Sequence, residues 1–250
     1  MKKIATAVAL LAGVSIGSSV MAGGNHGTDW GYEGHSGPEH WSNLSKEFGT
    51  CDKGTRQSPI NITGGYSSGL KPISFDYKSA KLDIVNNGHT IQVNRPEGSS
   101  ITVDGERFEL LQFHFHTPSE NIVAGKPYDM EMHLVHKSEK GQLAVVGVFM
   151  KMGKENAVIS EAWKHMPIKA GDTDTIASVS INAADLLPEG KAYARFNGSL
   201  TTPPCSEGVR WMVMKQPIEL SSSQVKQFAK VVGENARPVQ PLNSRFVLAE

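Results

Sequence analysis

The sequence predicts a mainly β, single-domain protein that carries a few short helices on its surface. Several short segments are rich in β-branched and aromatic residues, which favour strands, whereas only two segments have helical spacing of apolar residues. The 25 glycines are spread through the chain, as expected for turns between short strands. No repeat, low-complexity tract or Pro/Ser-rich linker divides the 250 residues, so one domain accounts for them.

The predicted strands are runs of apolar residues bounded by turn-forming residues. The polar stretch 137–142 contains Gly141 and predicts a hairpin connection between two of these strands. The strands are predicted at residues 82–85, 90–93, 108–116, 130–136, 143–150 and 209–214.

Two surface helices are predicted from apolar residues at spacings of three and four. Serines stand before the second helix as N-cap residues, and Gly233 stands after it as a stop signal. The apolar positions are Val158, Ile159, Ala162, Trp163 and Met166 in the first helix, and Val225, Phe228, Ala229 and Val232 in the second.

The N-terminal segment is predicted to be a secretory signal peptide over residues 1–22, followed by the domain over 23–250. Two lysines precede an apolar run over 4–16, and small residues stand at the −3 and −1 positions of a cleavage after Ala22. The run is too short for a membrane anchor. A short amphipathic or buried first helix is the alternative. We therefore expect export, to the periplasm as the first choice and full secretion as the second.

The charge of the chain argues against several classes of partner. There are 25 basic and 25 acidic residues, and cleavage after Ala22 removes two lysines and no acid, which leaves a formal charge of −2. Because there is no basic stripe, nucleic acid and anionic membranes are poor partners. No second long apolar segment predicts a membrane span. Oligomer formation is compatible with the sequence, which contains no signal that specifies it.

The chain has two cysteines, Cys51 and Cys205. In an exported protein a single disulfide between them is the favoured interpretation. A thiolate metal site is the alternative, which is disfavoured because neither cysteine has a second one nearby.

Two of the nine histidines share one face of a predicted strand. Successive side chains of a strand point to opposite faces, so Gln112, His114 and His116 lie together. Phe113 and Phe115 then enter apolar packing on the other face.

A neighbouring strand supplies a third histidine by the same rule. Glu131, His133 and Val135 share one face, and His136 falls on the opposite side, where we interpret it as a core histidine.

Two histidines from one strand and one from a neighbour can bind a zinc ion through three neutral nitrogens. The fourth position then stays open for water, which is typical of catalytic zinc sites. Gln112 and Glu131 lie two residues from His114 and His133 and suit the role of acceptors for the second ring nitrogen of each. Core histidines with satisfied hydrogen bonds, and ordinary polar strand residues, are the alternatives.

At these residues the sequence closely resembles the α-class carbonic anhydrases, over nearly the whole chain after the signal peptide. The individual motifs are short, but their order and spacing are specific. Besides the two histidine strands, the resemblance lies in WGY at 30–32, GPEHW at 37–41, RQSPINI at 56–62, NNGH at 86–89, GSLTTPP at 198–204, RP at 237–238 and QPL at 240–242.

The resemblance implies a single domain around a large, twisted, mostly antiparallel sheet, with zinc at the base of a conical cleft. It implies that His114, His116 and His133 bind Zn²⁺, and that Cys51 and Cys205 form the disulfide of bacterial members. It also implies a gate formed by Glu120 and Thr201, a proton shuttle at His89, a water network at Tyr32, Asn87 and Gln92, support of His116 by Asn235, and a substrate pocket of Val135, Val145, Leu200, Thr202, Val209 and Trp211.

Without the resemblance, most of these residues have ordinary interpretations. Glu120 would be a surface-loop acid, Thr201 a turn residue and His89 a surface histidine, while the apolar pocket residues would belong to the core.

The activity implied is the reversible hydration of CO₂ to bicarbonate and a proton, by attack of a zinc-bound hydroxide, with a histidine carrying the proton away. A non-catalytic binding module of the same fold and a zinc esterase are the two rival functions. The helical H-E-x-x-H motif of zinc proteases is absent from the sequence.

Overall fold

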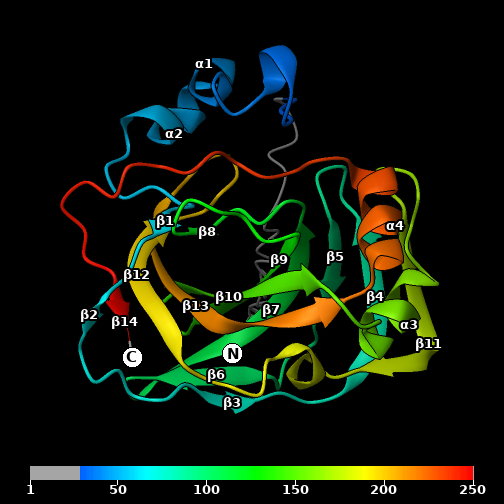
Figure 1. The fold of residues 1–250 in the computed structure, drawn as a ribbon. Coiled ribbons are helices and arrows are strands. Elements are labelled where there is room, and N and C mark those ends of the chain that lie inside the picture. Colours follow the sequence, from blue (N-terminus) through cyan, green and yellow to red (C-terminus); the bar gives the residue numbers. More distant parts are fainter. Residues whose placement is uncertain (1–28, 250) are drawn as a thin grey trace, which may run out of the picture.

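The computed structural model describes residues 29–249, and the predicted signal peptide lies outside this range. Its framework is a 12-stranded sheet in the order β11-β4-β5-β7-β9-β10-β13-β12-β14-β2, with β6 also paired to β7 and β3 to β6. A second sheet contains β1 and β8. Figure 1 shows the strands of the large sheet twisting across the molecule, with α1, α2, α3 and α4 at its margins.

The strands are β1 (Asn61–Ile62), β2 (Tyr66–Ser67), β3 (Ser74–Asp76), β4 (Ala80–Asn86), β5 (Ile91–Asn94), β6 (Ser100–Val103), β7 (Glu106–His116), β8 (Ile122–Val123), β9 (Met130–Ser138), β10 (Leu143–Met152), β11 (Thr173–Ile181), β12 (Tyr193–Ser199), β13 (Glu207–Leu220) and β14 (Leu248–Ala249). The helices are α1 (Trp41–Leu44), α2 (Thr50–Lys53), α3 (Ala157–Trp163) and α4 (Ser222–Val232), with 3₁₀ turns η1 (Gly34–Ser36), η2 (Lys46–Phe48) and η3 (Ala183–Leu186).

Most neighbouring strands run antiparallel, which confirms the predicted fold class. The exceptions in the large sheet are β10 with β13 and β14 with β2, which run parallel. All six predicted strands are present, and β13 is longer than predicted because it continues to Leu220 along β10. The predicted hairpin closes between β9 and β10 through the backbone bond from Ser138 to Gln142.

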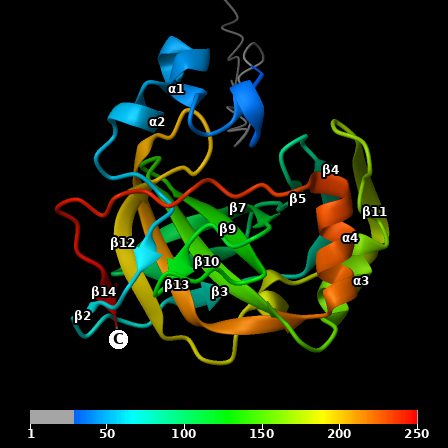
Figure 2. The ribbon, with the colours of Figure 1, turned by 45° about the horizontal axis from the view of Figure 1, so that its top comes forward.

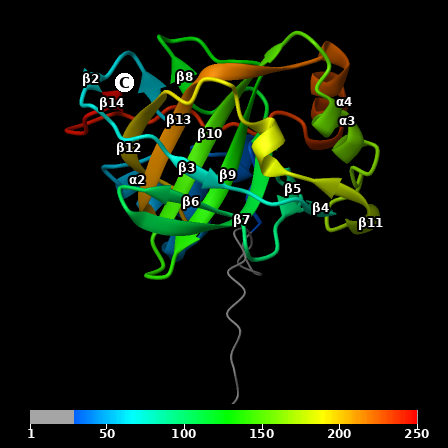
Figure 3. The same ribbon diagram turned by 90° about the horizontal axis from the view of Figure 1, so that it is seen from below.

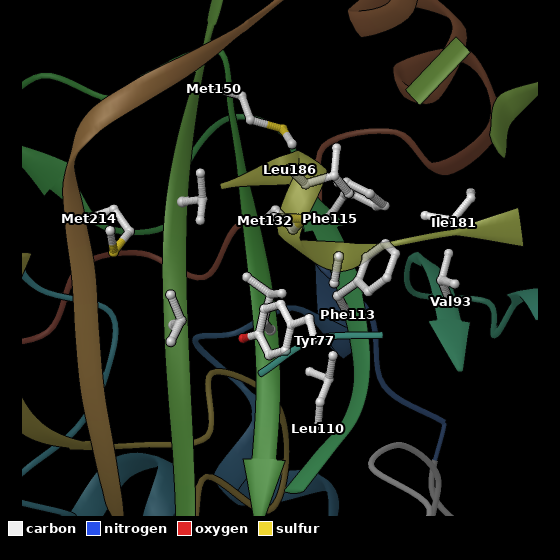
Figure 4. Close-up of a cluster of buried hydrophobic side chains, with 14 of the residues drawn as sticks. Tyr77, Val93, Leu110, Phe113, Phe115, Met132, Met150, Ile181, Leu186 and Met214 are labelled. Carbon is white, nitrogen blue, oxygen red and sulfur yellow. The ribbon is translucent and has the colours of Figure 1, made fainter. Parts of the chain in front are cut away.

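One face of the central strands carries the main hydrophobic core, which we call the core face. Phe113 and Phe115 of β7 and Met132 of β9 are at most 1% exposed and belong to one apolar cluster. Figure 4 shows these side chains packed together with residues of neighbouring strands. The alternation predicted from the sequence is therefore observed: residues 113 and 115 point into the core, and their neighbours point away from it.

The two predicted helices cover the core face at one end of the sheet. Trp163 of α3 and Phe228 of α4 are buried, and their rings contact Phe115 at centroid distances of 5.9 and 6.2 Å. Helix α4 begins with a capping box at Ser221 and ends at Gly233, whose φ of 78° favours glycine. Figures 2 and 3 show α3 and α4 side by side next to β4 and β11. Within residues 29–249, no helix is long and apolar enough to cross a membrane.

Candidate metal centre

Three histidines meet on the face of the sheet opposite the core, which we call the cleft face. His114 and His116 come from β7, and His133 comes from β9 directly opposite His114 in the register. One ring nitrogen from each lies within 4.8 Å of the others, so the three form a group that can hold a metal ion. The strand alternation that buries residues 113 and 115 is what brings these rings together.

The second ring nitrogen of each histidine faces an oxygen. His114 Nδ1 lies 2.8 Å from Gln112 Oε1, and His116 Nδ1 lies 2.8 Å from the backbone oxygen of Asn235. His133 Nε2 lies 3.2 Å from Glu131 Oε1. These contacts leave His114 Nε2, His116 Nε2 and His133 Nδ1 for a metal.

The group fits a zinc ion in its chemistry and its burial. His116 Nε2 is fully buried and has no hydrogen-bond partner, which would cost free energy unless a ligand satisfies it. Burial lowers the pKa of His116 to about 4 and lowers the pKa values of His114 and His133 well below their usual range. All three imidazoles are therefore neutral at pH 7, and neutral imidazole is the form that binds metal.

Glu131 and Glu120 are both fully buried beside this group. Burial raises the pKa of Glu131 to about 7, and hydrogen bonds from Asn121 oppose the shift. Burial also raises the pKa of Glu120 to about 8, against hydrogen bonds from Arg237 and Thr201. A divalent cation among the histidines would favour the ionised form of both carboxyl groups.

Glu120 lies between the histidines and the loop that carries Thr201. Its Oε2 is 3.5 Å from His116 Nε2 and 3.8 Å from His133 Nδ1. Its carboxyl group is hydrogen-bonded to the Thr201 side chain and accepts from the backbone N–H of Arg237 at 2.9 Å. Thus the two residues of the expected gate are in contact, next to the histidine nitrogens that converge in the cleft.

A cleft of about 590 Å³ opens above the histidines. Five of the six expected pocket residues line it, and the sixth, Val209, is 1% exposed and packs with Val135, Val145 and Trp211 in the adjacent apolar cluster. The expected water-network residues and His89 also line the cleft. The five pocket residues are Val135, Val145, Leu200, Thr202 and Trp211, and the network residues are Tyr32, Asn87 and Gln92.

His89 lies on the cleft wall but is less accessible than expected. Its ring stacks on Trp30 at a centroid distance of 3.6 Å and an interplanar angle of 6°, which leaves it half-buried. Burial lowers the pKa of His89, and the charge of Asp29 opposes this shift. The Asn87 side chain accepts from the backbone N–H groups of His89 and Thr90 and so stabilises a turn before β5.

Comparison with known proteins decides the family. The model of the eukaryotic-type carbonic anhydrase family matches residues 36–250. The chain belongs to the α-class carbonic anhydrase family. A carbonic anhydrase of Neisseria gonorrhoeae is 49% identical over 245 residues, covering 97% of this chain and 95% of that protein. One of Klebsiella pneumoniae is also 49% identical, with 88% and 90% covered.

Solved structures of α-carbonic anhydrases have the same fold. The enzyme of Thermovibrio ammonificans, determined with the inhibitor sulfanilamide, is 49% identical and superposes with a TM-score of 0.87 over 89% of this chain and 99% of that one. Dioscorin, determined with ascorbate, superposes with a TM-score of 0.82 at 30% identity. The chain is thus an enzyme of the carbonic anhydrase class.

The disulfide expected for this α-carbonic anhydrase is present between Cys51 and Cys205, with an S–S distance of 2.03 Å. It packs against the buried rings of Trp41 and Phe48. Cys205 lies in the same loop between β12 and β13 as Thr201, and its N–H donates to Thr202 O at 2.8 Å. The bridge therefore connects that loop to α2.

Three residues around the carbonic anhydrase site were not identified as site residues from the sequence. Arg237 donates from its backbone to Glu120 and from its guanidinium to Cys51 O, Ser58 O and Gln57 Oε1 at 2.8–2.9 Å. Asn121 donates to the Glu131 carboxylate, and Gly147 lies against the same carboxylate. Arg237 stands in a motif that carried the resemblance, but its role depends on contacts across more than 100 residues.

Asn235 contacts His116 through its backbone and not through its side chain. The acceptor for His116 Nδ1 is the backbone oxygen of Asn235. The side chain of Asn235 instead accepts from Thr117 N–H and donates to the backbone oxygens of His89 and Phe115. The amide group therefore fixes the position of the carbonyl that faces His116 Nδ1.

Proposed function

We propose that this chain catalyses the reversible hydration of CO₂ to bicarbonate and a proton, with a zinc ion held by His114, His116 and His133. The observation that carries this proposal is the convergence of three neutral imidazoles, two of them buried and that of His114 partly buried, whose other nitrogens face fixed oxygens. A bound Zn²⁺ would supply hydroxide at neutral pH by lowering the pKa of its water to about 7, the established value for carbonic anhydrases.

Thr201 and Glu120 orient the nucleophile in this proposal. When the Thr201 hydroxyl donates to the Glu120 carboxylate, its oxygen can only accept toward a second group in the cleft. The backbone N–H of Arg237 donates a second hydrogen bond to the same carboxylate. A nucleophile that donates to Thr201 must therefore turn a lone pair toward the substrate.

The substrate pocket is the apolar part of the cleft wall. The apolar lining residues are Val135, Val145, Leu200 and Trp211. The Trp211 ring packs edge-on against the His133 ring, with a distance of 4.8 Å between ring centroids. CO₂ is uncharged, so an apolar wall can hold it weakly without competing for the polar groups.

His89 moves the product proton from the cleft to buffer in this proposal. A group with a pKa near 7 releases protons to water at only about 10³ s⁻¹, so faster turnover needs a relay. The imidazole of His89 lies on the wall, with Tyr32, Asn87 and Gln92 on the same cleft. These polar side chains can order the water between it and the metal.

Metal content measured together with stopped-flow CO₂ hydration tests the zinc proposal. Wild-type protein should contain one zinc ion per chain and lose activity on chelation, and zinc should restore it. His133→Ala should lose both metal and activity, by at least about 10³-fold in turnover. A metal-free wild-type protein that stays inactive after refolding with zinc would contradict the proposal.

Ester hydrolysis measured in parallel with CO₂ hydration tests the esterase alternative. That alternative is favoured if esters are turned over faster than CO₂. The non-catalytic alternative is not supported, because all three expected ligand histidines are present.

The proton route is tested by His89→Ala in dilute and in imidazole buffer. Zinc content should be unchanged, and maximal turnover should fall toward the roughly 10³ s⁻¹ that direct release allows. Added imidazole should restore part of the rate. An unchanged rate in dilute buffer would remove His89 from the mechanism.

We also propose that the chain is exported to the periplasm after cleavage near Ala22. The support is the sequence pattern of residues 1–22 together with a disulfide, which is typical of oxidising compartments. N-terminal sequencing of protein from a periplasmic extract would test this proposal, and an intact N-terminus in the cytosolic fraction would contradict it.

A further inference from the structure

The carboxylate of Glu131 is held on both oxygens by one neighbouring residue. Asn121 Nδ2 donates to Oε1 and the Asn121 backbone N–H donates to Oε2, each at 2.8 Å. The backbone of Glu120 also hydrogen-bonds to this carboxylate. The direction in which Glu131 faces is therefore set by two consecutive residues of the loop before β8.

Asn121 is itself fixed in orientation. It is 0% exposed, and its Oδ1 accepts from the backbone N–H of Ile60 at 3.1 Å. Its backbone oxygen accepts from Ser119 Oγ at 2.7 Å. Because the amide oxygen is engaged by an N–H donor, the amide nitrogen has to face Glu131, and the reversed amide would lose both bonds.

Gly147 closes the other side of the carboxylate. It lies opposite His133 in the register between β9 and β10. A Cβ atom at this position would lie 2.8 Å from Glu131 Oε1 and 3.4 Å from Val213 Cγ2. Any larger residue would therefore displace the carboxylate from the place where it faces His133.

We propose that Asn121 and Gly147 form a carboxylate socket that positions Glu131 to select the tautomer of His133. With Glu131 in the socket, Nε2 of His133 carries the proton and Nδ1 is left as the lone-pair donor toward the histidine group. A displaced carboxylate would leave the proton free to occupy Nδ1, which then cannot bind a metal. Both socket residues are positioning residues that act through Glu131, and the inference rests on the proposed zinc site.

Zinc affinity of the metal-free protein tests the socket, measured by competition with a chromogenic chelator. Asn121→Ala and Gly147→Ala should each bind zinc about tenfold more weakly and release it faster, as for loss of other groups that orient metal ligands. Two matched controls lie outside the socket. Asn182→Ala removes an asparagine that caps η3, and Gly49→Ala adds a Cβ whose nearest contact is an ordinary 3.5 Å. Both controls should bind zinc as the wild type does.

The tautomer of His133 gives a readout that general destabilisation does not change. Nitrogen-15 NMR of the metal-free wild type at pH 9, where the Glu131 carboxyl group is ionised, should show the proton on Nε2, and both socket variants should show a mixture of tautomers. The cobalt-substituted variants should also have a shifted visible spectrum, because the ligand field changes with the orientation of His133. If Asn121→Ala does not fold, Gly147→Ala carries the same test.

The two proposals fail in different ways. A wild type that binds no zinc contradicts the proposed function, while the tautomer measurement still tests the socket because it needs no metal. Wild-type zinc affinity and an unchanged His133 tautomer in the socket variants would overturn the socket.

Discussion

Two histidines of β9, three residues apart, occupy opposite faces of the same sheet. His133 and His136 are both buried, and burial lowers the pKa of each, in His136 to about 3. Both ring nitrogens of His136 face partners, with Nε2 2.8 Å from the Tyr77 hydroxyl and Nδ1 3.3 Å from Ala144 O. His133 Nε2 lies 3.2 Å from Glu131 Oε1, while Nδ1 faces two other histidines and Glu120.

This comparison separates what burial does from what a metal site needs. Burial makes an imidazole neutral on either face, so neutrality alone does not indicate a ligand. A ligand histidine differs in having one ring nitrogen fixed by the protein and the other directed at similar groups. On the core face the same residue type only completes a local hydrogen-bond network.

The core face should carry the larger share of stability, and Phe115→Ala tests this. Phe115 is 0% exposed and contacts the rings of Trp163 and Phe228, so truncation should reduce the free energy of unfolding by about 3–5 kcal/mol. Urea unfolding measures the loss, and zinc affinity of the folded variant should be retained. A proportional loss of zinc affinity would show that the two faces are not independent.

Zinc should stabilise the protein through the cleft face only. At a free zinc concentration of 100 times Kd, the free energy of unfolding should rise by about 2.7 kcal/mol. His136→Asn should keep this increase although it is less stable, whereas His116→Ala should lose it. Thermal unfolding with and without zinc distinguishes the two, and an increase retained in His116→Ala would contradict the assignment of ligands.

Protonation of His136 should contribute to the pH dependence of the free energy of unfolding. Its folded-state pKa is lowered to about 3, below an unfolded value near 6.5, so its neutral form stabilises the fold above pH 6.5. That contribution is lost as the pH falls from about 6.5 toward 3, by at most about 1.4 kcal/mol per pH unit. Metal-free His136→Asn should be less stable than metal-free wild type at pH 7.5, but should lose less stability on acidification. Parallel pH profiles would contradict this account.

Strand periodicity accounts for most of what the sequence predicted correctly. Alternation along residues 112–116 and 131–136 is a local property, so it correctly placed the three clustered histidines on the face opposite Phe113, Phe115 and His136. The same rule correctly paired Gln112 with His114.

The alternation of side chains along a strand did not predict contacts between distant segments. The socket joins Asn121 and Gly147 across two strand connections, and nothing in the local sequence of either residue marks it. The half-buried state of His89 depends on Trp30, which lies 59 positions earlier and reaches the cleft only in the folded chain. Strands such as β11 and β12 were also missed, because their exposed or mixed side chains give no clear alternation.

Arg237 has a consequence for the order in which the molecule becomes functional. Its contacts with Cys51, Ser58 and Glu120, and the neighbouring Asn235 carbonyl at His116, unite segments that are almost 190 residues apart. A polypeptide is synthesised from its N-terminus, so all three ligand histidines emerge long before these contacts can form. Zinc captured by a nascent chain would meet ligands without their orienting carbonyl. Assembly of the centre therefore waits for residues 235–237, although its three histidines lie in the middle of the chain.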